Sequence, residues 1–162
     1  MFGNIYAIIE IPFVKGLSYK FNFANNYRTA SNNYFRSYES NFQGQGSKSE
    51  EKRYDWTSDN ILSYKRTFND IHHLDITLLY GREKRNQDYI QAIASVFSSH
   101  ELGYNRLQTG SAELQQAISG AWEESSLYNM ARVFYGFKNK YLLTGTIRRD
   151  GFSGFSEENK FG

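Results

Sequence analysis

The chain has 162 residues, and its 19 Lys and Arg residues nearly balance 17 Asp and Glu residues, giving a formal net charge of +2. This balance argues against a polycationic tail that binds nucleic acid and against an acidic disordered tail. The absence of cysteine excludes a disulfide scaffold, a thiol redox motif and a thiolate zinc site. Aromatic residues make up 17% of the chain although its mean hydropathy is −0.66, a combination expected of strands that alternate apolar and polar residues.

Period-two alternation of apolar and polar residues is the main structural signal. It is clearest where Tyr19 and Phe21 share one face and Lys20 and Asn22 share the other. A sixth segment, residues 127–137, is also predicted as a strand, although its two faces separate poorly. The five better-supported strands are predicted at residues 5–11, 17–24, 59–68, 73–81 and 141–148.

Short and long connections alternate between these strands. Residues 12–16, 69–71 and 138–139 have the length of hairpin turns, whereas residues 29–53 and 86–125 are predicted as long polar loops. Short turns at one end and long loops at the other are typical of transmembrane β-barrels. A soluble antiparallel sheet with one wet face gives the same alternation of side chains, but compact soluble domains rarely carry two such loops.

Aromatic residues fall where a barrel has its interfacial girdles, with Tyr64 and Phe68 toward one end of a strand pair and Trp56 and Tyr80 toward the other. The second long loop is predicted to hold a short helix, preceding the weak capping-box pattern of Ser98-x-x-Glu101. Its apolar residues recur at helical spacing: Tyr89, Ile90, Ile93, Ala94 and Phe97. No run of about 18 apolar residues could form a transmembrane helix, and the first residues lack a signal-peptide pattern.

Histidines and carboxylates offer weak catalytic or metal-binding candidates. His72 and His73 are adjacent in a predicted strand, so they point to opposite faces and are not expected to share a metal. His100 and Glu101 begin like a zincin helix, but the second histidine of that motif is replaced by Tyr104. The acidic pairs are expected to be solvated surface rather than acid–base catalysts: Glu50–Glu51 and Glu123–Glu124.

Two sequence segments carry a family resemblance. Residues 132–143 read RVFYGFKNKYLL, and residues 148–155 read RRDGFSGF. They resemble the R-(V/L)-x-Y-x-(Y/F)-x-x-(K/R)-Y-L-(L/F) hairpin and the R-x-D-G-S-S-x-F segment of SusC/RagA-like TonB-dependent outer-membrane receptors of the Bacteroidota, with Phe152 and Gly154 as departures. The segments at 60–68, 72–81 and 12–17 are similar to preceding hairpins of that family, so the resemblance spans nearly the whole chain.

The resemblance implies an all-β fold, an antiparallel up-and-down meander of about six strands within a larger transmembrane β-barrel of the outer membrane. It implies import of glycans or peptides, driven through TonB and assisted by a SusD-like lipoprotein, with no enzymatic activity, cofactor or metal. Residues 1–162 are expected to form only part of the barrel domain. The plug domain, the TonB box and a carboxy-terminal strand ending in an aromatic residue are expected to be absent, because the sequence stops at Lys160-Phe161-Gly162.

The phase of the predicted strands places Arg132 and Arg148 on the face that would line the lumen, where polar side chains tune passage. Ordinary strand-end structure remains the alternative for both arginines. Three aromatic residues of the long loops could stack on sugar rings or pack against a lipoprotein: Tyr89, Tyr104 and Trp122. The alternative function is a soluble all-β carbohydrate-binding module, which predicts a closed core between two sheets. If the barrel prediction holds, the chain alone is not expected to transport.

Overall fold

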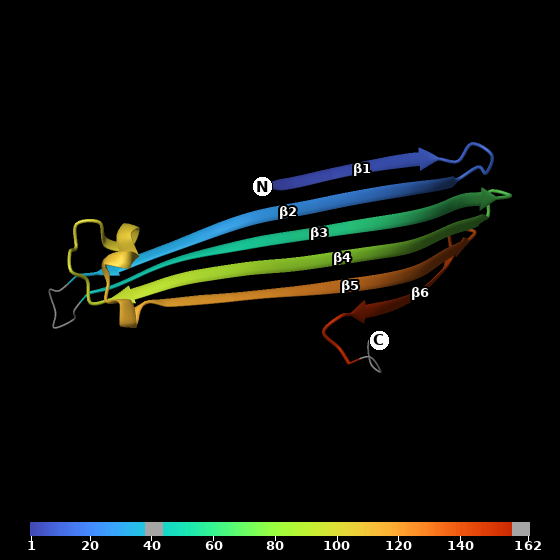
Figure 1. Cartoon of the computed structure of the whole chain (residues 1–162). Coiled ribbons are helices and arrows are strands. Elements are labelled where there is room, and N and C mark those ends of the chain that lie inside the picture. The colour runs from blue at the N-terminus through green and yellow to red at the C-terminus, as the bar shows by residue number, and fades with distance from the viewer. Residues whose placement is uncertain (38–43, 157–162) are drawn as a thin grey trace. The chain divides into compact units, whose positions relative to one another are not determined.

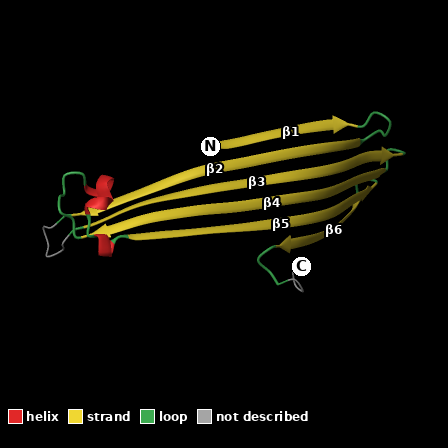
Figure 2. Cartoon of the chain, in the orientation of Figure 1, coloured by secondary structure: helices red, strands yellow, loops and turns green. Residues whose placement is uncertain are grey.

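The computed structural model describes residues 1–37 and 44–156, and the described residues contain six strands in one sheet. Each strand neighbours the next strand in the sequence, which is the order of an up-and-down meander and confirms the predicted fold class (Figures 1 and 2). The strands are β1 (Phe2–Glu10), β2 (Leu17–Arg36), β3 (Gln45–Phe68), β4 (His72–Ser95), β5 (Gln116–Phe137) and β6 (Tyr141–Phe152). Two 3-10 helices, η2 (Gly103–Thr109) and η3 (Ala112–Leu114), lie between β4 and β5.

The chain divides into two compact units. Unit 1 contains Met1–Asn26, Asp55–Arg85 and Glu124–Gly162, and unit 2 contains Tyr27–Tyr54 and Asn86–Glu123. Strands β1 and β6 therefore belong to unit 1, whereas β2, β3, β4 and β5 each contribute residues to both units. Within the described residues, no helix has the length and apolar character needed to cross a membrane.

The three predicted hairpin turns are confirmed in unit 1. The first is closed by a hydrogen bond from the Ile11 amide to the Leu17 carbonyl at 2.9 Å. The other two each place two residues in the left-handed region, Asn69 and Asp70 at φ of 50° and 55° and Lys138 and Asn139 at 52° and 54°. Positive φ at both central residues matches the right-handed twist of the paired strands. Among residues other than glycine, Asn and Asp tolerate it best, so Lys138 is the exception of the four.

The strand pairs of unit 1 place alternate residues on opposite faces. In β1 and β2, Ile5 pairs with Phe23 and Ile9 with Tyr19. In β5 and β6, Ala131 pairs with Ile147, whereas the next position along β5, Arg132, pairs with Thr146. Directly opposed residues point to the same side of a sheet, so the predicted alternation becomes one largely apolar face and one polar face.

The soluble two-sheet core expected of a carbohydrate-binding module is not found in the described residues. Their buried hydrophobic side chains are Ala94 and Phe97, both in unit 2. The apolar residues of unit 1 are instead open to the surroundings, with exposed fractions of 67% for Ile5, 70% for Leu143 and 72% for Ile147. Unit 1 is therefore a single sheet whose apolar face no other part of the described chain covers.

The long loop predicted at residues 29–53 is wrong over most of its length, and the one predicted at residues 86–125 is wrong over half of its length. Strand β2 continues to Arg36, β3 begins at Gln45, β4 continues to Ser95 and β5 begins at Gln116. Both faces of these extensions are polar, so hydropathy gives no period-two signal there. Charged pairs between or along the strands replace apolar contacts, as between Arg28 and Glu51 at 3.7 Å. The centre of the first predicted loop, residues 38–43, lies outside the described residues. Residues 160–162, on which the expected absence of a carboxy-terminal strand depends, also lie outside them.

The helix predicted around Tyr89 and Phe97 is also wrong, because β4 runs through this segment to Ser95. Pairing with β3 and β5 on both sides outweighs the helical spacing of its apolar residues. The helical turns lie further on, in η2 and η3. The Ser98-x-x-Glu101 pattern does not act as a capping box, because η2 begins at Gly103 and the Ser98 hydroxyl donates to the Thr109 carbonyl at 3.3 Å.

Phe97 forms the small core of unit 2, with 1% of its side chain exposed. It packs edge-on against Phe35, with ring centroids 5.2 Å apart. Gly46 lies beneath these rings, where a Cβ atom would come within 3.1 Å of Phe97 and 3.2 Å of Phe35. Of the apolar residues at helical spacing, Ala94 at the end of β4 and Phe97 in the following turn are buried, and Phe97 belongs to this aromatic cluster.

The first hairpin turn provides a test of the fold. Gly16 has φ of +87°, and a Cβ atom there would overlap the Lys65 carbonyl oxygen. We expect Gly16→Ala to lower the free energy of unfolding by about 1–3 kcal/mol in a urea titration. Gly145→Ala is the matched control, because its Cβ meets nothing within 4 Å. Equal stability of the two variants would show that this turn is not built as described.

Candidate functional site

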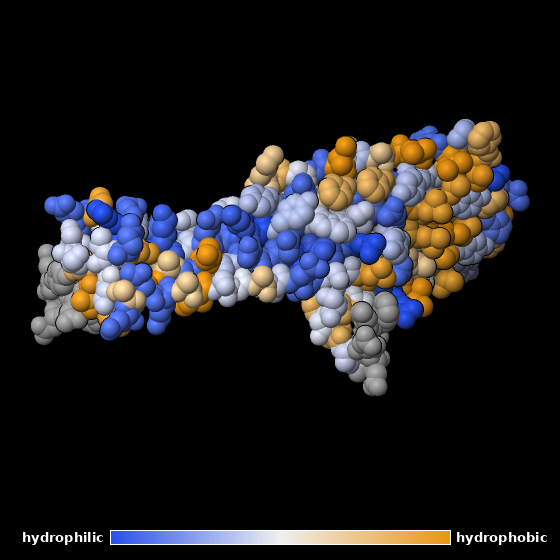
Figure 3. Space-filling model, in the orientation of Figure 1, coloured by the Kyte–Doolittle hydropathy of each residue, from blue (hydrophilic) through white to orange (hydrophobic). Residues whose placement is uncertain are grey.

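The apolar face of unit 1 extends across all six strands. Figure 3 shows apolar side chains, in orange, gathered over the strands near the hairpin turns, at the right of the view. In the β1–β2 and β5–β6 pairs, many apolar residues occupy every second paired position, and such residues lie on one side of the sheet. The paired apolar positions are Ile5, Ala7 and Ile9 on β1, Tyr19, Phe21 and Phe23 on β2, Ala131, Val133 and Tyr135 on β5, and Leu143 and Ile147 on β6.

Aromatic side chains lie beside polar side chains on part of this face. Trp56 stacks on Phe23, with ring centroids 6.2 Å apart and planes inclined by 29°. The Tyr19 hydroxyl donates a hydrogen bond to Asn60 Oδ1 at 2.5 Å, and Asn60 Nδ2 reaches the Tyr80 carbonyl at 3.5 Å. Aromatic rings beside amide and hydroxyl groups are typical of a membrane–water interface.

The opposite face carries a network of polar side chains that begins at Tyr128 on β5. The Tyr128 hydroxyl donates a hydrogen bond to the Asp59 carboxylate on β3 at 2.6 Å. The Arg148 guanidinium lies over the same ring, 5.3 Å from its centroid. Tyr128 thus connects β3 with β6. Its hydroxyl binds Asp59, and its ring binds the Arg148 guanidinium.

Gly81 on β4 makes this position of Tyr128 possible. Gly81 is buried, and a Cβ atom there would overlap the Tyr128 ring. A glycine inside a strand usually weakens it but allows a neighbouring group to approach the backbone closely. The Tyr128 ring therefore crosses the bare backbone of β4 on its way to Asp59.

Ion pairs extend the network along the same face. Arg148 makes three hydrogen bonds of 2.8–3.0 Å with Asp150, the residue that pairs with Tyr128 in the sheet. Arg85 donates to Glu83 at 2.5 Å and to Glu124 at 3.3 Å. Because these groups are partly exposed to water, they contribute charge and hydrogen-bonding capacity to the surface more than stability.

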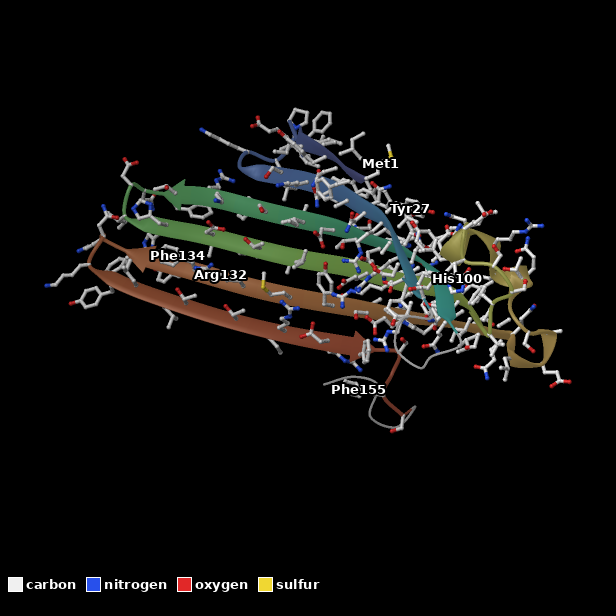
Figure 4. All side chains as sticks on the ribbon, turned by 90° about the vertical axis from the view of Figure 1, so that its left-hand side faces the viewer. Met1, Tyr27, His100, Arg132, Phe134 and Phe155 are labelled. Atoms are coloured by element: carbon white, nitrogen blue, oxygen red, sulfur yellow. The ribbon has the colours of Figure 1, made fainter. Side chains whose placement is uncertain are left out.

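The two arginines singled out from the sequence share this polar face. Arg148 pairs with Met130, and Arg132, two positions further along β5, pairs with Thr146. Figure 4 labels Arg132 and Phe134 on β5. The structure places Arg148 within the tyrosine network and Arg132 at an exposed position of the same face. Whether this face lines a lumen stays a prediction.

The histidines and paired carboxylates occupy separate environments. His72 Nδ1 lies 2.7 Å from the Tyr135 hydroxyl, and His73 Nδ1 lies 3.0 Å from the Thr67 hydroxyl. Tyr135 belongs to the apolar face of β5, so the two histidines point apart as expected. In the described ranges, no three His, Cys, Asp or Glu side chains come together as a metal site.

The acidic pairs likewise engage different neighbours. Glu50 pairs with Lys52 at 3.2 Å, whereas Glu51 pairs with Arg28. A hydrogen bond to Glu50 raises the pKa of Lys52 above its ordinary value. Glu124 accepts its hydrogen bond from Arg85.

The aromatic residues predicted for the loops lie partly in strands. Tyr89 is in β4, where its hydroxyl donates to Gln91 at 2.7 Å, and Tyr104 is in η2. Trp122 is in β5, with the Arg53 guanidinium 5.7 Å from its ring. Trp122 is exposed, so this cation–π pair places an aromatic ring beside a guanidinium at the surface of unit 2.

Sequence reasoning missed the centre of the polar network. Tyr128 lies in the predicted strand at 127–137, whose two faces separate poorly because Tyr128 and Met130 share its polar face. The available signal was Gly81, a glycine within a predicted strand, which marks a close approach. The sequence does not say which ring approaches it, because that depends on the stagger between β4 and β5.

Comparisons with known proteins give a consistent result. No protein-family model matches the chain. TonB-dependent receptor P39 of Formosa agariphila is 32% identical over 178 residues, covering 99% of this chain and 16% of the receptor. TonB-dependent receptor P3 of the same organism is 34% identical over 105 residues, covering 64% of this chain and 10% of the receptor. The chain thus spans about a sixth or less of the length of these curated relatives.

Solved structures show the same fold. The RagAB peptide transporter matches with a TM-score of 0.84 at 20% identity, covering 98% of this chain and 18% of that chain. The RagAB peptide importer in its open-open state matches with a TM-score of 0.84 at 21% identity, covering 99% and 18%. At this identity the likeness shows that the strand meander is the same.

The contact between Gly81 and Tyr128 can be tested by a double-mutant cycle. We expect Gly81→Ala to lower the free energy of unfolding by about 1–3 kcal/mol, because the new methyl group displaces the Tyr128 ring. In a Tyr128→Ala background most of that cost should disappear. Gly136→Ala is the control, since a Cβ there makes only ordinary contacts at 3.4–3.5 Å. An equal cost of Gly81→Ala in both backgrounds would contradict the contact.

Proposed function

We propose that this chain, a SusC/RagA-like TonB-dependent receptor sequence, forms part of the wall of an outer-membrane β-barrel that imports a nutrient. The observation that carries the proposal is the two-faced sheet of unit 1. One face exposes a continuous set of apolar side chains, and the other carries the network around Tyr128. A sheet with these two faces fits between lipid and a water-filled lumen.

Backbone hydrogen bonding favours further strands on both sides of this sheet. In lipid, each unsatisfied backbone group costs several kcal/mol, so only closed barrels and helices cross the membrane. Bacterial barrels usually have at least eight strands, and the described sheet has six. We infer that β1 and β6 pair with other strands of a longer receptor, and that residues 1–162 belong to its barrel domain.

The lengths of the long strands support a membrane part and a part beyond it. About 9–11 residues of a tilted strand cross the bilayer. Strands β3 and β4 have 24 residues each, and β5 has 22. We assign the portions of these strands in unit 1 to the membrane, with the hairpin turns toward the periplasm.

The transported nutrient is proposed to be a glycan or a peptide too large for a porin, with import energised through TonB. The curated relatives are named as TonB-dependent receptors, and the matching structures are of a peptide transporter. A plug domain and a TonB box would be supplied by parts of the receptor other than residues 1–162. A SusD-like lipoprotein is the proposed partner on the extracellular side, where Trp122 and Arg53 offer an exposed aromatic surface.

An enzymatic function has no support in the comparisons, since the relatives are receptors and transporters. A soluble carbohydrate-binding module would have to leave the apolar face of unit 1 in water. That face includes Ile5, Leu143 and Ile147, each more than two-thirds exposed. Contiguous apolar surface of this kind marks a membrane or protein contact.

Uptake by intact cells tests the proposal. Cells that express the whole receptor should accumulate a labelled oligosaccharide or peptide, and deletion of the receptor gene or of tonB should abolish that uptake. Fractionation should place the receptor in the outer membrane, and an affinity tag on it should recover a lipoprotein. Recovery of the receptor in the soluble fraction, or uptake unchanged without tonB, would overturn the proposal.

A further inference from the structure

We propose that the turn end of the apolar face of unit 1 binds anionic phospholipids of the periplasmic leaflet through three cations that lie over aromatic rings. The cations are Arg66, which precedes the second hairpin turn, and Lys138 and Lys140 at the third. All three are exposed and belong to unit 1. The inference rests on the proposed function, because it requires the apolar face to meet lipid and the turns to lie toward the periplasm.

Each cation lies over an aromatic ring at the end of a strand. The rings belong to the last residue of β3, the last residue of β5 and the first residue of β6. The distances from cation to ring centroid are 5.0 Å for Arg66 and Phe68, 5.3 Å for Lys138 and Phe137, and 5.6 Å for Lys140 and Tyr141. A ring attracts a cation and restricts its aliphatic stem, so less conformational entropy is lost when that cation binds a phosphate.

The rings of β5 and β6 lie on the apolar face. Phe137 and Tyr141 pair with each other, two positions from Tyr135 on that face of β5, and their ring centroids are 6.4 Å apart. The His72 ring lies 5.1 Å from Phe137, and its Nδ1 lies 2.7 Å from the Tyr135 hydroxyl. Rings with polar tips at the margin of an apolar surface suit the headgroup level of a bilayer.

The same face carries Arg66 and Phe68 on β3. The Thr67 hydroxyl contacts His73, whose side chain lies on the polar face. Successive side chains of a strand point to opposite faces, so Arg66 and Phe68, on either side of Thr67, point to the apolar face. The Arg66 guanidinium also donates to the Tyr64 hydroxyl at 3.5 Å, and a guanidinium has further N–H groups for a phosphate.

Positive charge predominates at this end of the face. The Lys138 amide donates to the Ile71 carbonyl at 2.7 Å, which joins the second and third turns. Residues 66–72 and 137–141 contain three Lys or Arg residues and a single acidic residue, Asp70. A cation over a ring keeps its N–H donors for phosphate oxygens. Charge complementarity therefore favours a lipid with a net negative charge over a zwitterionic one.

Spin-labelled lipids test this surface on the intact receptor. The receptor would be reconstituted in phosphatidylcholine bilayers with a trace of spin-labelled phosphatidylglycerol or phosphatidylcholine, and electron paramagnetic resonance would give the fraction of each lipid that the protein immobilises. We expect the wild-type receptor to prefer phosphatidylglycerol. The double variant Lys138→Gln and Lys140→Gln should lower this preference by about fivefold or more, since one Lys or Arg beside anionic lipid has an effect of about that size.

Two lysines on the polar face provide the matched control, because replacing them removes the same amount of charge. Lys20 lies 5.4 Å from the centroid of the Tyr6 ring, and Lys65 pairs with Asp75 at 3.3 Å. The double variant Lys20→Gln and Lys65→Gln should keep the wild-type preference for phosphatidylglycerol.

A third double variant, Lys138→Arg and Lys140→Arg, should also keep the preference, because both charges remain. Equal preference in the two glutamine variants, or an unchanged preference without Lys138 and Lys140, would overturn the lipid surface. Heat-modifiable migration in gels, measured on the same samples, reports barrel insertion. A receptor that inserts but shows no preference for anionic lipid overturns this inference alone, whereas one that never inserts overturns the proposed function.

Discussion

The opposite orientation of successive side chains in a β-strand is the constraint on which this molecule depends. It gives unit 1 an apolar face and a polar face from a single layer of backbone, with no core between them. The same constraint separates His72 from His73 and places Arg148 and Arg149 on different faces. Each face then requires its own surroundings, and lipid on one side with water on the other satisfies both.

The polar face is organised by a close approach of ring and backbone. Tyr128 lies over Gly81, hydrogen-bonds to Asp59 and accepts the Arg148 guanidinium on its ring. One aromatic side chain of β5 therefore contacts three other strands, β3, β4 and β6, on the polar face. Such a contact also fixes the stagger of neighbouring strands, because a slip by one residue would move Tyr128 to the apolar face. The extensions in unit 2 have no comparable apolar face and depend on paired charges and the small core at Phe97.

The sequence predicts the strands in which the alternation of apolar and polar residues matches the two faces of the sheet. Strands with apolar faces, such as residues 17–24, and turns such as Asn69-Asp70 follow from the sequence because lipid-facing alternation and positive φ leave clear patterns. The polar halves of β3 and β4 cannot be predicted in this way, because a strand with both faces exposed to water has the same composition as a loop. The helical spacing around Phe97 misled for a related reason, since pairing with neighbouring strands is invisible in one segment. The alternation alone places Arg132 and Arg148 on one face, whereas the contact between Tyr128 and Gly81 follows only from the stagger of the strands.

The most direct measurement is the accessibility of single cysteines at adjacent positions of β6 in the assembled receptor. The 162 residues contain no cysteine, so each new thiol within them is unique. Thr144→Cys and Leu143→Cys lie side by side in the chain but on opposite faces. A water-soluble maleimide should label the thiol at position 144 and not that at position 143 while the receptor is in the membrane, and both after unfolding. Equal labelling of both thiols in the membrane would contradict the account of one lipid-facing and one water-facing side.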